Sequence, residues 1–148
     1  MAKTNARWIR VLLDDKGTDN VAISENVMSV SSVGLTHDTQ DVTGYSDGWH
    51  NVTLGHPSAP IVISGPYSNA PTTTMNHVLV DPTDGILGDQ SAAYTLSIQI
   101  GQKAVPSGGE PVFSGEYYAA SYVINGSDMT YTAEFIPATA AVPAWSTV

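Results

Sequence analysis

Apolar and polar residues alternate with a period of two along much of the chain, as in strands that bury one face. The alternation is regular over residues 94–100 and returns over 112–124 and 129–135. Between the last two segments lies Asn125-Gly126, which favours a two-residue type I′ turn because both of its central positions need a positive φ. The pattern therefore predicts a C-terminal β-hairpin. The residues predicted to share a face are Tyr94, Leu96, Ile98 and Ile100; Tyr118, Ala120, Tyr122 and Ile124; and Met129, Tyr131, Ala133 and Phe135.

Shorter apolar stretches predict further strands at residues 8–13, 21–23, 27–33, 49–54 and 61–67, separated by turn-rich clusters such as DDKGTDN and GHPSAP. One segment differs, because Met75, Val78 and Leu79 follow a helical spacing behind three threonines that are suited to N-capping. Pro82 is expected to end this helix near Asp81. The predicted fold class is mainly β (α+β), with seven or eight strands in a two-sheet sandwich or barrel-like domain, one short flanking helix and extended termini.

A single domain is expected, because 148 residues suffice to bury one core. We assign residues 1–136 to this domain and residues 137–148 to an extended C-terminal tail, which shows no periodicity. The tail carries Trp145, and an exposed tryptophan at a chain end lowers solubility unless something covers it. The tail is therefore expected either to fold back on its own domain or to dock on a neighbouring subunit.

The net charge of −9, from 14 acidic and 5 basic residues, argues against specific nucleic-acid binding because an acidic surface repels phosphate backbones. The absence of cysteine excludes disulfides, thiolate metal sites and cysteine nucleophiles. No stretch reaches the length of a transmembrane helix, and no signal peptide or membrane partner is expected.

Patterns that would indicate catalysis or metal binding are weak throughout. His50 and His56 are six positions apart, which fits no common zinc motif. The segment 81–89 lacks the alternating acids and the final glutamate of a calcium loop, so it is interpreted as a turn with solvated acids. Asp14 and Asp15 are adjacent and do not form a glycosidase pair. No nucleophile elbow, P-loop or dinucleotide-binding glycine pattern is present. We therefore predict no enzymatic activity, no cofactor and no metal site.

The segment DVTGYSDGWHN, residues 41–51, joins two predicted strands and holds two aromatic residues and a histidine. Before it comes SVSSVGLTHDTQ, which we expect to form one strand, and after it come LGHPSAP, IVISGPY and APTTTMNHVLVD. In this order, over about residues 20–136, the sequence resembles the major tail tube proteins of long-tailed, siphovirus-like bacteriophages. That family has an acidic-Val-Thr-Gly-aromatic-x-Asp-Gly segment, a Leu-Gly turn, an Ile-x-Ile-Ser-Gly strand and a Thr-rich helix start. The matching positions are Asp41–Tyr45, Asp47, Gly48, Leu54, Gly55, Ile61, Ile63–Gly65, Thr72–Thr74 and His77–Leu79.

The resemblance implies a structural virion protein rather than an enzyme. Family members form six-membered rings that stack into the tail tube, through which DNA passes without specific binding. The expected partners are other copies of the chain and other tail proteins, in a virion tail that is assembled in the host cytoplasm. The loop after the third strand commonly contributes to ring stacking. The residues expected at a subunit interface are Thr43, Tyr45, Asp47, Trp49 and His50, together with Trp145 of the tail.

Two other functions are compatible with the same sequence. A decoration protein that trimerises on a phage head would also be a β-rich domain with extended ends. A carbohydrate-binding β-sandwich module would use Trp8, Trp49 or Trp145 as a stacking platform. For each tryptophan, packing in a core or an interface is the simpler role.

Overall fold

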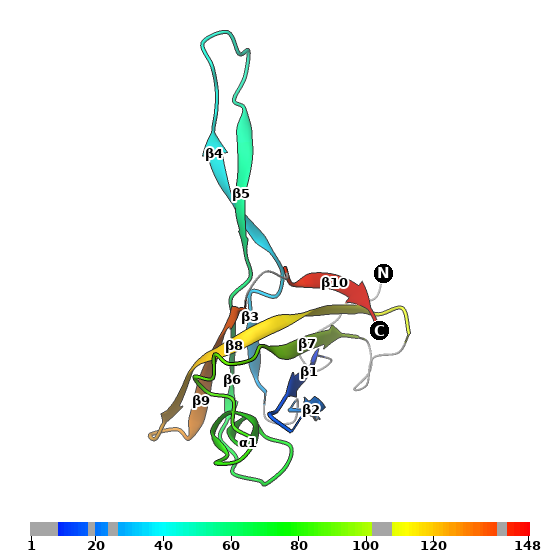
Figure 1. Ribbon diagram of the computed structural model, residues 1–148, viewed down its shortest axis with the longest axis vertical. Coiled ribbons are helices and arrows are strands. Elements are labelled where there is room, and N and C mark those ends of the chain that lie inside the picture. Colours follow the sequence, from blue (N-terminus) through cyan, green and yellow to red (C-terminus); the bar gives the residue numbers. More distant parts are fainter. Residues whose placement is uncertain (1–8, 18–19, 24–26, 102–107, 139–141) are drawn as a thin grey trace.

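Ten strands and one short helix are found in the described part of the chain, which comprises residues 9–17, 20–23, 27–101, 108–138 and 142–148 of this computed structural model (Figure 1). The mainly β class with two sheets and one short helix is confirmed. Trp8 lies outside the described residues. The strands are β1 (Ile9–Asp14), β2 (Asn20–Ala22), β3 (Ser29–Ser31), β4 (Thr36–Asp41), β5 (Val52–Ser58), β6 (Ile61–Pro66), β7 (Tyr94–Ile100), β8 (Pro111–Asn125), β9 (Thr130–Pro137) and β10 (Ala144–Thr147), and the helix is α1 (Met75–Val80).

Eight of the strands form one antiparallel sheet in the order β2-β1-β7-β8-β9-β6-β3, with β10 added to β8. The 15-residue strand β8 joins the two halves of this sheet: its first half pairs with β7 and its second half with β9. The register shifts between Ala119 and Ser121, at a β-bulge. Because a bulge bends a strand and increases its twist, the sheet can curl over one core there. The described strands leave this sheet open, with β2 and β3 at its ends.

The core is built from alternate residues of the strands and follows the predicted period of two. Alternate residues of β6, β7 and β9 are buried, including Ile61, Leu96 and Phe135. The inward face predicted for 94–100 is confirmed, and so is that of 129–135 except for Met129, which is exposed. Helix α1 adds three fully buried side chains, Met75, Val78 and Leu79.

The helix begins and ends where the sequence predicts. The Thr74 hydroxyl accepts a hydrogen bond from the backbone N–H of His77, which satisfies one of the free donors at the helix N-terminus. Asp81 is the C-cap, directly before Pro82. No helix in the described residues is long and apolar enough to cross a membrane.

The turn between β8 and β9 differs from the prediction. Neither Asn125 nor Gly126 has a positive φ, so the prediction of a two-residue type I′ turn is wrong. The connection is longer, and it closes with Met129 in the left-handed region at φ 54°. The Asn125 side chain stabilises it by accepting hydrogen bonds from the backbone and hydroxyl of Ser127.

The face predicted for β8 is also wrong over part of its length. Tyr117 and Ala119 are buried, whereas Tyr118 is half-buried and Ala120 is exposed. The bulge inserts one residue after Ala119, so the alternation changes phase and Tyr122 packs against the core again. A single period drawn through the strand cannot represent this shift.

Three other segments depart from the predicted strands. The strand expected over SVSSVGLTHDTQ is split into β3 and β4, because Ser32 (φ 56°) and Gly34 (φ 137°) have backbone conformations that interrupt a strand. The strand predicted at 49–54 begins only at Val52. The tail, for which no strand was predicted, contains β10, which pairs with the first residues of β8; of the two outcomes expected for the tail, it therefore folds back on its own domain. The boundary after residue 136 stays a prediction.

Candidate interface at the tip of the β4–β5 ribbon

Strands β4 and β5 form a two-stranded antiparallel ribbon that projects from the body of the molecule (Figure 1). Every residue of both strands is exposed. A two-stranded ribbon without a covered face is only marginally stable in water. Its sequence therefore contributes little to the core, which is consistent with a segment used for contacts with another molecule.

The ribbon contains an irregularity that its sequence accommodates. The register shifts between His37 and Thr39, opposite Gly55. A Cβ atom at Gly55 would lie 3.2 Å from the Cβ of Asp38 and 3.3 Å from its carbonyl oxygen, so the close approach of the two strands favours glycine there. The bulge adds twist to the ribbon, and twist protects an exposed edge from unspecific pairing.

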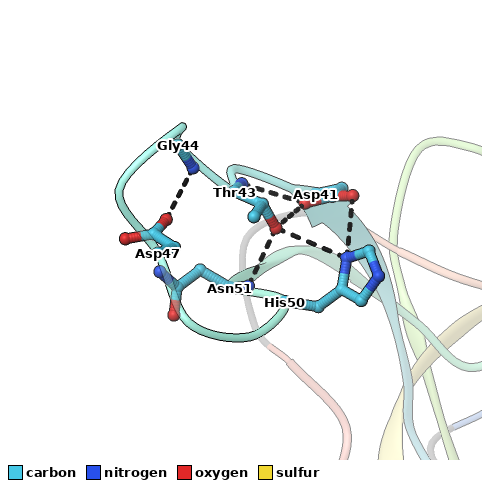
Figure 2. A network of polar contacts seen from close by, with 6 residues as sticks. All are labelled: Asp41, Thr43, Gly44, Asp47, His50 and Asn51. Carbon is cyan, nitrogen blue, oxygen red and sulfur yellow. Dashed lines mark hydrogen bonds and ion pairs between the residues drawn. The ribbon is translucent and has the colours of Figure 1, made fainter.

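A network of hydrogen bonds within the loop holds the tip, residues 42–51 (Figure 2). One oxygen of Asp41 accepts hydrogen bonds from the backbone N–H (2.9 Å) and the hydroxyl of Thr43. The same hydroxyl accepts from the backbone N–H of Asn51 (3.0 Å), which joins the two sides of the loop. Asp47 accepts from the backbone N–H of Gly44. The polar groups that shape the loop are therefore bonded to one another.

The two carboxylates of the tip are stabilised in their ionised form. The pKa of Asp41 is lowered, mainly by the hydrogen bonds from the hydroxyl and backbone of Thr43. The pKa of Asp47 is lowered mainly by the backbone N–H of Gly44. Hydrogen bonds that favour the charged form of an acid have this effect. The loop is therefore anionic at neutral pH.

His50 and its neighbours have the composition of a hydrolytic triad but not its geometry. The Nδ1 atom of His50 lies 3.4 Å from Asp41 and 3.5 Å from the hydroxyl of Thr43, so both contacts fall on the same nitrogen. In a triad the acid and the nucleophile bind opposite ring nitrogens. The hydroxyl also donates to Asp41 instead of to the imidazole. These contacts shape the loop and do not activate a nucleophile.

The aromatic side chains of the tip are exposed to solvent. Tyr45 is fully exposed, Trp49 is 80% exposed, and the nearby Val42, Val52 and Leu54 are each more than half exposed. Apolar groups gathered at the end of a projecting ribbon are typical of a contact surface, and Tyr and Trp are enriched in protein interfaces. Neither aromatic residue belongs to the core of this chain.

The structure brings together five of the six residues predicted at an interface: Thr43, Tyr45, Asp47, Trp49 and His50 all lie at the ribbon tip. The sixth, Trp145, lies on β10, where its ring packs against Phe113 with 5.1 Å between centroids. It also covers Gly34, close to the start of the ribbon, and about half of its surface stays exposed. Whether these residues contact a partner remains a prediction.

No protein-family model matches the sequence, and no curated protein matches it significantly. Solved structures do share the fold over nearly the whole chain. One is a chain from the tail of an empty gene transfer agent particle with C6 symmetry, at 18% identity and a TM-score of 0.65, covering 97% of this chain and 99% of that one. Another is the tube-terminating cap of the anti-feeding prophage, at 14% identity and 0.66, covering 100% and 93%. A third is the sheath/tube terminator of an extracellular contractile injection system, PVC, at 13% identity and 0.58, covering 93% of each chain.

Proposed function

We propose that the chain is a structural subunit of a phage-like tail tube, in which copies assemble into six-membered rings that stack into a conduit for DNA. The observation that carries this proposal is the fold, which agrees over nearly the full length with chains from a tail particle and from tube terminators. The exposed ribbon supports a role in assembly. Such a subunit would reside in the tail of a phage-like particle, with other tail proteins as partners.

Ring stacking is assigned to the ribbon tip. Tyr45 and Trp49 are exposed apolar groups on a projection long enough to extend beyond the body, and their loop is already ordered by hydrogen bonds (Figure 2). An ordered loop loses less conformational entropy on binding than a mobile one. Buried interface aromatics contribute a few kcal/mol each, on the order of what decides assembly.

Lateral contacts within a ring are assigned to an open edge of the large sheet. On one edge of β8, strand β7 pairs only as far as Tyr117, and beyond it the backbone N–H of Gly88 donates to the carbonyl of Ala119. Among the described strands none pairs with that side of β8 from Ser121 to Asn125, where Val123 and Ile124 are exposed. A closed ring would cover such edges on every copy. Six copies would also carry a net charge of −54 (six times −9), which disfavours adhesion of DNA.

A tube terminator is the second candidate, because two of the structures that share the fold are terminators. A tube subunit would grow into long tubes of uniform width, whereas a terminator would stop at single rings. Negative-stain electron microscopy of the purified protein distinguishes these outcomes. A strictly monomeric protein at high concentration would contradict both assignments, and stable trimers that bind only preformed heads would favour a decoration protein.

The stacking role is tested with the double variant Tyr45→Ser and Trp49→Ser. Both side chains are exposed, so we expect the circular dichroism spectrum and the thermal midpoint of the variant to stay close to those of the wild type. We expect rings to form but tubes to be lost. Val80→Ser, an exposed apolar residue on α1 away from the ribbon, serves as the matched control and should leave tubes intact. Normal tubes from the double variant would contradict the stacking role of the tip.

A further inference from the structure

A second cluster of ionisable side chains lies near α1, at the opposite end of the molecule from the ribbon tip (Figure 1). Asp15 follows β1, His77 is on α1, and Asp84 is in the loop after the helix. One ligand atom from each side chain lies within 4.8 Å of those of the other two. The backbone N–H of Lys16 donates to the carbonyl of Asp84 (3.2 Å), which holds the two segments side by side.

This cluster is not a solvated surface. Asp15 is only 5% exposed, the His77 side chain is 16% exposed, and Asp84 is partly buried. Carboxylates brought together away from water repel one another, and a bound cation offsets that repulsion. The ammonium of the adjacent Lys16 pairs with Asp89, at 3.6 Å.

The imidazole of His77 has a carboxylate on each side. Its Nδ1 atom lies 3.6 Å from an oxygen of Asp81, and its Nε2 atom lies 3.9 Å from an oxygen of Asp15. In metal sites a carboxylate next to one ring nitrogen commonly orients the imidazole, so that the other nitrogen can bind the ion. The positions of Asp81 and Asp15 correspond to that arrangement.

A glycine, Gly17, also lies next to the cluster. A Cβ atom at Gly17 would lie 3.2 Å from Oδ1 of Asp15 and 3.7 Å from Oδ1 of Asp84. A side chain at this position would therefore press against the carboxylate of Asp15 and make an ordinary contact with that of Asp84. Glycine leaves room beside these two oxygen atoms.

We propose that Asp15, His77 and Asp84 form a binding site for a divalent first-row transition metal ion, with Asp81 as a positioning residue. One imidazole with two carboxylates suits Zn²⁺ better than the all-oxygen sets that Ca²⁺ and Mg²⁺ prefer. Bonds of about 2.1 Å in a tetrahedral site separate ligand atoms by about 3.4 Å. Binding would therefore draw the three side chains together, mainly by rotation of the partly exposed Asp84.

A metal in this position would join the end of β1 to the helix and to the loop after it. Its contribution would be to the stability of the body, since a ligand that binds only the folded state stabilises that state. The site does not depend on the proposed assembly role, and the two can fail separately.

The experiment is a calorimetric titration of the untagged full-length chain with ZnCl₂, repeated with CaCl₂. We expect saturable binding of one Zn²⁺ per chain, a rise in the thermal midpoint, and no comparable binding of Ca²⁺. The variants Asp84→Asn and His77→Gln should each weaken Zn²⁺ binding by about tenfold or more. The matched controls Asp38→Asn and His56→Gln change exposed residues of the ribbon and should leave the affinity unchanged.

Spectroscopy adds a readout that does not depend on the folding of a variant. Zn²⁺ should shift the ¹⁵N resonance of the His77 Nε2 atom in the wild-type protein more than that of Nδ1. The absence of saturable binding would overturn the site, and so would binding that is lost in His56→Gln but kept in His77→Gln. Either result would mean that the cluster serves only as an internal ion-pair network.

Discussion

The hydroxyl of Tyr117 fixes the base of the ribbon, and its removal is the most direct test of how the ribbon is attached. Tyr117 lies on β8 and is 1% exposed; its hydroxyl donates a 2.8 Å hydrogen bond to the carbonyl of Ala59, which is equally buried. Ala59 directly follows β5, so this bond joins the ribbon to the strand that organises the large sheet. The variant Tyr117→Phe deletes the donor and keeps the ring.

The expected loss of stability follows from burial. A typical hydrogen bond contributes about 1 kcal/mol net, and a buried carbonyl left without a donor costs about 1 to 3 kcal/mol. Since the ring still fills its site, we add no term for a cavity and expect Tyr117→Phe to lower the free energy of unfolding by about 1 to 2 kcal/mol. With a urea m-value of about 2 kcal/mol/M, the midpoint would fall by roughly 0.5 to 1 M.

Equilibrium unfolding in urea measures this loss, with Tyr122→Phe as the matched control. The Tyr122 hydroxyl reaches Asn76 at 3.3 Å, and both residues are half-buried, so water can replace the lost bond and the loss should stay below about 0.5 kcal/mol. The m-value should not change in either variant. If Tyr117→Phe were as stable as the wild type, or no less stable than Tyr122→Phe, the bond to Ala59 would not anchor the ribbon.

Two further predictions concern the body of the protein. Burial raises the pKa of Tyr117 and of Tyr122 to about 12 from an unfolded value of 10.0. The two protonated hydroxyls therefore contribute fully to the free energy of unfolding below pH 10, and this contribution is lost as the pH rises through about 12. The urea midpoint should fall over that interval as tyrosinate absorbance appears, and a flat midpoint would contradict the shifts. In Gly115→Ala the new Cβ would lie 2.6 Å from the Cβ of Pro143, a rigid neighbour just before β10. We therefore expect the free energy of unfolding to fall by about 1 to 3 kcal/mol, and the Trp145 fluorescence to shift to the red as β10 separates from β8. An unchanged spectrum and urea midpoint would mean that β10 is not held there.

Local signals in the sequence were sufficient for the elements that local interactions determine. Helix α1 follows from the Thr74 cap and the Pro82 stop, and both act within a few residues. Strand β7 is regular over its whole length and buries one face, so its pattern predicts it fully. The mainly β class follows from several such strands.

The elements that the pattern missed depend on distant partners or on the absence of a core face. Strand β4 is exposed on both sides and therefore shows no period. Strand β10 exists because residues 144–147 pair with residues 111–114, a contact that no periodicity within the tail can reveal. The phase change in β8 comes from a bulge, which sequence alternation does not mark.

The two candidate sites also differ in whether neighbours in the sequence or distant segments form them. The ribbon tip is a continuous segment, so the resemblance identified Thr43, Tyr45, Asp47, Trp49 and His50 together. The cluster near α1 joins Asp15 to His77, 62 positions further on (77 minus 15), and only the fold brings them together. The nearest signal in the sequence was the group of acids after Asp81, which by itself indicates a turn.

The pairing of β1 with β7 also determines when the fold can be completed during synthesis. Ile9 pairs with Ile100, which the ribosome adds 91 residues later (100 minus 9), and β6 likewise pairs with the much later β9. At about 5 to 20 residues per second, the backbone groups of β1 that will pair with β7 wait roughly 5 to 18 seconds for this partner. A chain whose translation stops before β9 leaves one edge of β6 unpaired and its core open. Incomplete translation products therefore cannot complete the sheet from which the ribbon projects.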